Sequence, residues 1–364
     1  MIDQTIREGM QYRGMMLSEK ERLKLIGFQE ALGVDISQAA YPPAHDSEKE
    51  ILNCLHEKTV KKGYRMRIAG LGRALKKDAD LIMDTGVNDI HLHIAINREN
   101  VDSGFDLLRQ TVHHIRARSE EACIEVNILD LGNIDSGFLR ESAQIIINEL
   151  EIDILTLPDT SGILPPNLLF DKIRMVTELV KDKSTLTGAH CHNDMGMATA
   201  NTVAGVAAGA SVIEVSALGI GERNGIGDLF IVGKNLKEQG YRLNLKTENI
   251  ETFRNYYEYV DGLCFQKTGI HLLNYNTPFF GNAVNTHVAG THGMTPFGTG
   301  NGEDFFLNVL CGKHLVKKFL EKNSIDFDEN RLSEIVSKIK KLSVEKGRSL
   351  TRKEVKGLIV GKTE

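Results

Sequence analysis

The chain has 364 residues, of which 41% are hydrophobic and 26% charged, and its formal net charge at pH 7 is −5. This length allows one large core, alone or with an appended unit, and the composition is ordinary for a globular protein. No long basic run accompanies the negative charge, which argues against nucleic acid or an anionic membrane as the main partner. No apolar segment approaches the roughly 20 residues that a membrane span needs, and no signal-peptide pattern opens the chain.

The five cysteines are widely spaced, and no C-x-x-C pair occurs among them. Such spacing, with an odd number of cysteines, fits a reducing compartment better than a disulfide framework. We therefore expect a cytoplasmic protein.

Eight short apolar segments recur along the first part of the chain, and each is predicted to be a strand. They span residues 2–6, 34–36, 66–71, 90–96, 124–129, 154–157, 186–189 and 212–218. Between them lie segments with apolar residues at helical spacing, among them 19–32, 78–85, 105–118, 168–180 and 195–210. Eight such β/α repeats over about 240 residues predict an α/β protein with a closed (β/α)8 TIM barrel. An open doubly wound sheet is the alternative, but no G-x-G-x-x-G follows the first strand.

The first strand is unusual because only Met1 and Ile2 precede Asp3. Either the barrel closes with a very short strand there, or the protein begins upstream of this sequence.

The pattern changes after about residue 265, so we expect a barrel over 1–265 and a linker with a small helical region over 266–364. Residues 274–302 are rich in Gly, Asn, Thr and His, which predicts an ordered loop region that carries function. From Phe305 onward the chain is rich in Lys, Glu and Leu and is predicted to be helical, with a basic, solvated face over 338–356.

His190 and His192 follow the predicted seventh strand and are separated by one residue. Residues i and i+2 of a strand point to the same face, so both imidazoles would project from its carboxyl end. Such a pair binds a divalent cation from one side and leaves other positions open, as a catalytic metal requires. Alone, the pattern also fits two surface histidines, so the assignment depends on the rest of the chain.

Polar residues follow other predicted strands, and the carboxyl ends of barrel strands converge on one mouth. They are Asp3, Thr5, Arg7 and Glu8 at strand one, Asn127 and Asp130 at strand five, Asp159 and Thr160 at strand six, and Glu222, Arg223 and Asn224 at strand eight. A carboxylate with two imidazoles is a ligand set for Mg²⁺, Mn²⁺, Fe²⁺ or Zn²⁺. Arg7 beside such a metal would stabilise a developing oxyanion. Each residue alone has an ordinary explanation, as an ion-pair partner or a helix cap, but their joint placement favours a site.

These residues lie in segments that resemble a known family. The segment DQTIREGMQ (3–11) resembles the D-x-T-L-R-[DE]-G-x-Q opening of metal-dependent condensing and lyase enzymes built on a (β/α)8 barrel. That superfamily includes isopropylmalate, homocitrate and citramalate synthases and hydroxymethylglutaryl-CoA lyase. The likeness continues in LPDTSG (157–162), HCHNDMGMATAN (190–201), GIGERNGI (219–226) and THVAGTH (286–292), and more faintly in GKH (312–314).

The resemblance implies metal ligands at Glu8, His190 and His192, which would bind Mg²⁺, Mn²⁺ or Zn²⁺. It also implies that Arg7 holds the carbonyl oxygen of a 2-oxo acid and that Thr160 contacts the carboxylate of that acid.

Two further roles follow from the same resemblance. His292 matches the histidine that assists deprotonation of the acetyl-CoA methyl group, and Glu222 matches a supporting acid/base residue. A histidine suits this task because its pKa lies near neutrality.

Details of the motifs separate the branches of the superfamily. The lyase carries a catalytic cysteine in the loop after strand eight, and the absence of cysteine from 219–226 favours a synthase. Ile226 stands where isopropylmalate synthases usually have an asparagine ligand, and Glu8 replaces aspartate. Both features make the chain most similar to homocitrate synthase-like members. The sequence also ends without the regulatory domain that follows many isopropylmalate synthases, so we do not expect feedback inhibition through such a domain.

The substrate pocket departs from the homocitrate pattern. The arginine and serine that hold the distal carboxylate of 2-oxoglutarate there correspond to Glu125 and Asn127, and the strand-three histidine corresponds to Leu75. We expect Glu125 and Asn127 to contact the substrate, and a glutamate would repel a distal carboxylate. The identity of the 2-oxo acid substrate therefore stays open. No tyrosine follows Tyr275, although synthases of this family generally bring one from the C-terminal region.

The resemblance implies an acyltransferase of amino-acid biosynthesis that condenses acetyl-CoA with a 2-oxo acid in a metal-dependent, Claisen-type reaction. The products would be CoA and a 2-alkylmalate- or homocitrate-type acid. Two alternatives stay open: a metal-dependent hydroxyacyl-CoA lyase or aldolase, and a catalytically silent barrel that serves as a binding partner. We expect a homodimer in which the C-terminal region of one chain contacts the barrel of the other.

Overall fold

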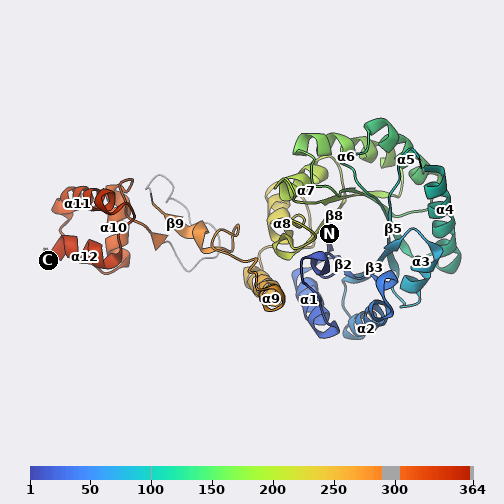
Figure 1. The fold of residues 1–364 in the computed structure, drawn as a ribbon, viewed down its shortest axis with the longest axis horizontal. Coiled ribbons are helices and arrows are strands. Elements are labelled where there is room, and N and C mark those ends of the chain that lie inside the picture. Colours follow the sequence, from blue (N-terminus) through green and yellow to red (C-terminus); the bar gives the residue numbers. More distant parts are fainter. Residues whose placement is uncertain (100, 289–303, 361–364) are drawn as a thin grey trace. The chain divides into compact units, whose positions relative to one another are not determined.

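Eight parallel strands close into one barrel, and each strand lies beside its neighbours in sequence (Figure 1). The computed structural model describes residues 1–99, 101–288 and 304–360. The strands are β1 (Ile2–Asp3), β2 (Ile36–Ala40), β3 (Arg67–Arg73), β4 (Asp89–Ile94), β5 (Cys123–Ile128), β6 (Ile154–Asp159), β7 (Leu186–Cys191) and β8 (Val212–Val215). The predicted TIM barrel is confirmed.

A ring of helices surrounds the barrel (Figure 1). The helices are α1 (Glu19–Leu32), α2 (Asp46–Lys62), α3 (Lys76–Met83), α4 (Val101–Arg118), α5 (Ser136–Glu149), α6 (Pro166–Val180), α7 (Ala198–Ala207) and α8 (Leu229–Glu238), followed by α9 (Ile250–Thr268). Helix α1 has its predicted bounds because a capping box between Ser18 and Glu21 starts it and left-handed Gly33 ends it. None of the described helices is long and apolar enough to cross a membrane.

Helix α7 is shorter than the predicted 195–210 segment. Gly196 has a left-handed φ of 73°, and the Asn193 side chain accepts a hydrogen bond from the Ala198 amide (3.1 Å), so the helix begins only at Ala198. Residues 193–197 therefore form a loop at the end of β7. Strand β8 stops at Val215, short of the predicted 218, and the chain then passes through a 3-10 turn over Ala217–Gly219 in which Leu218 has a left-handed φ of 57°.

The two-residue strand β1 closes the barrel by pairing on both sides. Ile2 lies opposite Ile36 of β2 and Glu214 of β8. The Asp3 carboxylate accepts a hydrogen bond from the Tyr256 hydroxyl of α9 (2.9 Å). A helix after the barrel therefore fixes the shortest strand, which compensates for its few backbone hydrogen bonds.

The chain divides into two compact units, Met1–Leu272 and Leu273–Glu364. Helix α9 continues to Thr268, past the boundary predicted at 265. The second unit contains a small parallel sheet of β9 (Thr286–His287) and β10 (Asp304–Phe305) and the helices α10 (Lys313–Lys322), α11 (Leu332–Lys346) and α12 (Arg352–Val360). It has a core of its own, built from residues between 305 and 359.

Gly188 of β7 lets a polar side chain occupy the barrel interior. It lies opposite Thr156 of β6, whose hydroxyl donates a hydrogen bond to the Glu125 carboxylate. A Cβ at position 188 would overlap that hydroxyl and lie 3.0 Å from Cβ and 3.2 Å from Cα of Thr156. The strand that carries His190 therefore packs closely because this position has no side chain.

We predict that Gly188→Ala lowers the free energy of unfolding by about 1–3 kcal/mol, because the added methyl group overpacks the barrel. Gly262→Ala in α9 is the matched control: no atom lies within 4 Å of its added Cβ. That substitution should raise the free energy of unfolding by about 0.5–1 kcal/mol through helix propensity. Urea denaturation of both variants measures the difference, and equal midpoints would contradict the packing argument.

Candidate active site

A cavity of about 580 Å³ lies among residues from the carboxyl ends of the barrel strands. Its volume is in the range of small-molecule sites. The polar residues that line it include Arg7, Glu8, Gln38, Tyr41, His93, Asn127, Thr160, His190, His192, Glu214 and Glu222. Seven residues predicted from the sequence are among these: Arg7, Glu8, Asn127, Thr160, His190, His192 and Glu222.

Glu8, His190 and His192 are nearly fully buried in the wall of this cavity. The two imidazole rings lie 4.9 Å apart at an interplanar angle of 60°. Burial is the main cause that lowers the pKa of each histidine to about 4. Burial raises the pKa of Glu8, but the Arg7 charge is the largest opposing cause, and the net effect holds that pKa below its usual value.

At neutral pH Glu8, His190 and His192 therefore offer one ionised carboxylate and two uncharged imidazoles. These are the protonation states in which such side chains bind a divalent cation. The residues present fit the metal ion that the family implies.

The loop after β8 orients Glu8. The Glu222 amide donates a hydrogen bond to Glu8 Oε1 (3.0 Å), and the other carboxylate oxygen forms an ion pair with Arg7. A Cβ at position 221 would lie 2.8 Å from Glu8 Cγ, so glycine at this position makes room for the carboxylate. The backbone of the 219–226 motif thus acts on the predicted metal site.

Arg7 is fixed by glutamine side chains. Its guanidinium donates hydrogen bonds to Gln4 (2.8 Å), Gln11 (2.7 Å) and Gln38 (2.5 Å). Among the described residues that line the cavity, Arg7 is the only arginine or lysine. It is therefore the permanent cation available to an anionic ligand in this part of the structure.

Two predicted polar residues serve structure rather than the cavity. Asp159 accepts hydrogen bonds from the Ile163 and Leu164 amides (3.4 and 3.1 Å), as a turn cap does. Arg223 donates to the Asp194 carboxylate (2.8 and 2.9 Å). Neither residue is part of the cavity wall, so their ordinary explanations hold.

Strand β5 supplies Asn127 to the cavity wall, but it does not supply Glu125. Glu125 is fully buried two residues earlier on the same face of the strand, and its carboxylate contacts His91 and Thr156. Because Glu125 does not line the cavity, the wall does not support the predicted contact between Glu125 and the substrate. It equally does not support the predicted repulsion between Glu125 and a distal carboxylate. Leu75 is also absent from the wall; Leu71 of β3 lies there instead.

His93, which was not among the residues predicted from strand ends, lines the cavity beside Tyr41. The Tyr41 hydroxyl lies 3.4 Å from His93 Nε2. The signal was present, because His91 and His93 repeat the H-x-H spacing of strand seven within the predicted strand 90–96.

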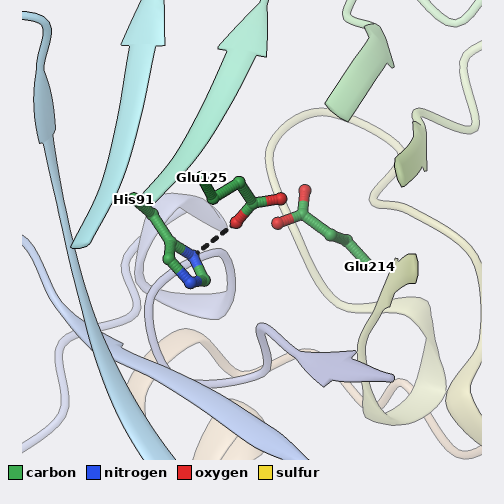
Figure 2. Close-up of side chains that lie close together, drawn as sticks. All are labelled: His91, Glu125 and Glu214. Atoms are coloured by element: carbon green, nitrogen blue, oxygen red, sulfur yellow. Dashed lines mark ion pairs between the residues drawn. The ribbon is translucent and has the colours of Figure 1, made fainter. Parts of the chain in front are cut away.

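His91, Glu125 and Glu214 form a buried cluster, and Figure 2 shows the two carboxylates pointing toward each other. His91 Nδ1 lies 2.7 Å from Glu125 Oε2, and one potential ligand atom of each residue lies within 4.8 Å of the others. Burial raises the pKa of Glu214 well above its usual value, and the Glu125 charge adds to this effect. We refer to these three residues as the buried cluster.

The second unit carries one predicted site residue, His292. His292 lies outside the described residues, so its predicted role stays a prediction. His287 of β9 is described, and its side chain is buried.

Comparisons with known proteins identify the family of the chain. A family model described as HMGL-like matches residues 1–256. The chain belongs to the HMGL-like family. It is 32% identical to a 2-isopropylmalate synthase of Sulfurisphaera tokodaii, over 94% of this chain and 90% of that protein. It is 29% identical to a 2-isopropylmalate synthase of Sulfolobus acidocaldarius, over 99% of this chain and 94% of that one.

Solved structures show the same fold. Hydroxymethylglutaryl-CoA (HMG-CoA) lyases of Bacillus subtilis and Brucella melitensis match with TM-scores of 0.58 and 0.59 at 15% and 16% identity. Each match covers 72% of this chain, and 92% and 97% of the respective lyase. The predicted superfamily is confirmed, whereas the closer similarity to homocitrate synthases stays a prediction.

Asp228 anchors the loop after β8 to the rest of the barrel. Its side chain accepts hydrogen bonds from the Ile231 amide (2.7 Å) and the Tyr257 hydroxyl (2.9 Å). Burial raises the pKa of Asp228 to about 6. The carboxyl proton of Asp228 is therefore bound more tightly in the folded protein than in the unfolded chain.

We predict that this proton makes the free energy of unfolding fall as the pH rises from about 4 to 6. The pKa difference corresponds to about 3 kcal/mol at most. The stabilisation is complete below the unfolded pKa and is lost as the pH passes the folded pKa. Asp228→Asn should remove this contribution, so urea denaturation of both proteins across the range isolates it. Parallel pH profiles would contradict the raised pKa.

Proposed function

We propose that the protein condenses acetyl-CoA with a 2-oxo acid and releases CoA and a 2-alkylmalate-type product. The observation that carries this proposal is the placement of Glu8, His190 and His192 with Arg7 in one cavity wall. Relatives named 2-isopropylmalate synthase, at about 30% identity over most of the chain, support it.

A divalent cation at Glu8, His190 and His192 would polarise the carbonyl group of the oxo acid. Arg7 would bind the carbonyl oxygen, where negative charge develops as the new bond forms. Its hydrogen bonds to three glutamines hold the guanidinium in place before substrate arrives, which reduces the reorganisation needed during the reaction. The Thr160 hydroxyl would contact the carboxylate of the oxo acid.

The proposed reaction removes one proton from the acetyl methyl group, and that carbon forms a bond to the carbonyl carbon. The carbonyl oxygen takes up a proton and becomes a hydroxyl group, after which water cleaves the thioester and releases CoA. We assign proton removal to His292, with Glu222 in a supporting role.

The cavity favours an oxo acid with an uncharged side chain. Apolar side chains, among them Met10, Leu71 and Leu129, line the wall together with Tyr41. Burial lowers the pKa of His93, and the nearby Arg7 charge adds to this effect, so the imidazole stays neutral. A distal carboxylate would find no cation other than Arg7 in the described wall, and an unpaired buried charge is costly. We therefore propose that 2-oxoglutarate is a poor substrate.

A thiol-release screen with acetyl-CoA and Mg²⁺ or Mn²⁺ tests this proposal. We predict turnover with 2-oxo acids that carry aliphatic side chains, at a kcat/KM at least roughly tenfold above that for 2-oxoglutarate. Folded, metal-loaded protein that releases no thiol with any oxo acid would refute the condensation.

We predict that His192→Ala abolishes thiol release and lowers the bound metal while the thermal unfolding midpoint of the metal-free protein stays near its wild-type value. One of three ligands is lost, and the imidazole lies at the cavity rather than in the apolar core. His113→Ala, at an exposed position on α4, is the matched control and should change neither quantity. Unchanged metal content and turnover in His192→Ala would refute the ligand assignment.

A further inference from the structure

Arg22 of α1 is completely buried, although it does not line the cavity. Its guanidinium forms an ion pair with the Glu48 carboxylate of α2, with one hydrogen bond of 2.9 Å. It also donates to the backbone oxygens of Leu17 and Ala39 (both 3.1 Å). A buried ion pair stabilises a fold little more than apolar side chains of the same volume would. The role of this pair therefore lies in the segments that it holds.

One of these segments is a bulge at the end of β2. The β3 partners of Gln38 and Ala40 are consecutive residues, so the pairing passes over Ala39 between them. Such an extra residue changes the faces to which the side chains after it point. Gln38 and Tyr41 both line the cavity although they are three residues apart, whereas regular alternation would point them to opposite faces. The bulge therefore helps to aim Tyr41 into the cavity wall.

The ion pair holds the backbone on both sides of this bend. Arg22 donates to the carbonyl oxygen of the bulged Ala39, and Glu48 Oε2 accepts a hydrogen bond from the Tyr41 amide (3.2 Å). The Arg22 guanidinium also lies 3.1 Å from the sulfur of Met10, another residue of the wall. Two prolines follow Tyr41 in the chain and restrict its backbone further.

We propose that Arg22 is a positioning residue that keeps Tyr41 in the cavity wall and thereby sets the space for the side chain of the oxo acid. The Tyr41 hydroxyl lies beside His93 in this wall (3.4 Å), so a displaced ring would widen this part of the cavity. The inference rests on the proposed function for the choice of substrate. The position of Tyr41, however, can be measured without any substrate.

Hydrogen exchange at the Tyr41 amide is the first test, and it needs no variant. Tyr41 lies outside β2, yet a buried carboxylate accepts its amide hydrogen. We therefore expect strong protection of this hydrogen in the wild-type protein, since it exchanges only when the segment opens. Exchange at the rate of an unprotected peptide would overturn the proposal.

The position of the Tyr41 ring is the second test. Protein labelled with 3-fluorotyrosine gives a ¹⁹F signal for each of its eight tyrosines, and Tyr41→Phe identifies one of them. The double variant Arg22→Met, Glu48→Leu replaces the ion pair by apolar side chains and leaves no buried charge unpaired. We expect its Tyr41 signal to move or broaden, because Ala39 and Tyr41 both lose their partners. A wild-type Tyr41 signal in the folded double variant would overturn the proposal.

Arg116 and Asp153 provide a matched control at the amino ends of the strands. Their side chains are 2.8 Å apart, Arg116 donates to backbone oxygens, and Asp153 accepts a hydrogen bond from the Ile124 amide (2.7 Å). The pair has the same kinds of contacts, but it does not line the cavity. The double variant Arg116→Met, Asp153→Leu should leave the Tyr41 signal unchanged. Equal shifts in both double variants would overturn the proposal, because they would report a general loosening of the barrel.

Substrate preference is the third test. Thiol release gives kcat/KM for 2-oxobutanoate and 2-oxopentanoate, which differ by one methylene group. Relative to the wild type, the Arg22→Met, Glu48→Leu variant should shift the ratio of the two values toward the longer acid by roughly tenfold. A general loss of structure would lower both values alike, so an unchanged ratio in the active variant would overturn the proposal. Wild-type protein that releases no thiol with any oxo acid would refute the proposed function, whereas the exchange and ¹⁹F results would still decide the role of Arg22.

Discussion

Parallel pairing of eight strands brings all their carboxyl ends to one end of the barrel, and every functional assignment depends on this constraint. Glu8, Asn127, Thr160 and His190 are far apart in sequence, yet they line one cavity because each follows or ends a strand of the same sheet. The closure depends on β1, which has two residues and is supported by the hydrogen bond from Tyr256 to Asp3. The site therefore needs the complete barrel, including the helix that follows it.

The interior of this barrel is polar beneath the cavity, which is costly unless each group finds a partner. Thr156, opposite the small Gly188, donates to Glu125, and Glu125 contacts His91. Glu214 contacts the proposed ligand His190. The same side chains that fill the barrel thus touch the cavity residues from below. Packing and the proposed chemistry share residues here, since the Glu214 carboxylate that helps fill the barrel contacts the cavity residue His190.

Much of the fold could be predicted because the signals are local. The capping box at Ser18 and the left-handed Gly33 set the bounds of α1, and the spacing of eight apolar segments predicted the barrel. The cavity residues could be predicted from strand ends, because strand direction alone decides where those ends meet.

Depth within the barrel could not be predicted from the sequence. Glu125 and Asn127 are two residues apart on one strand, but only Asn127 reaches the wall, and the stagger of neighbouring strands decides which residue does. For the same reason the spacing of His91 and His93 does not reveal that only His93 reaches the wall. Helix α7 begins late because a side chain of the preceding loop caps it at Ala198, a contact that hydrophobic periodicity does not report.

The central claim is that Glu8, His190 and His192 bind one divalent cation at the mouth of the barrel. A crystal structure of the protein soaked in Mn²⁺, with anomalous diffraction recorded near the manganese edge, tests it most directly. The account predicts one strong anomalous peak within bonding distance of all three side chains. A peak among His91, Glu125 and Glu214 instead, or no peak in the barrel, would contradict it.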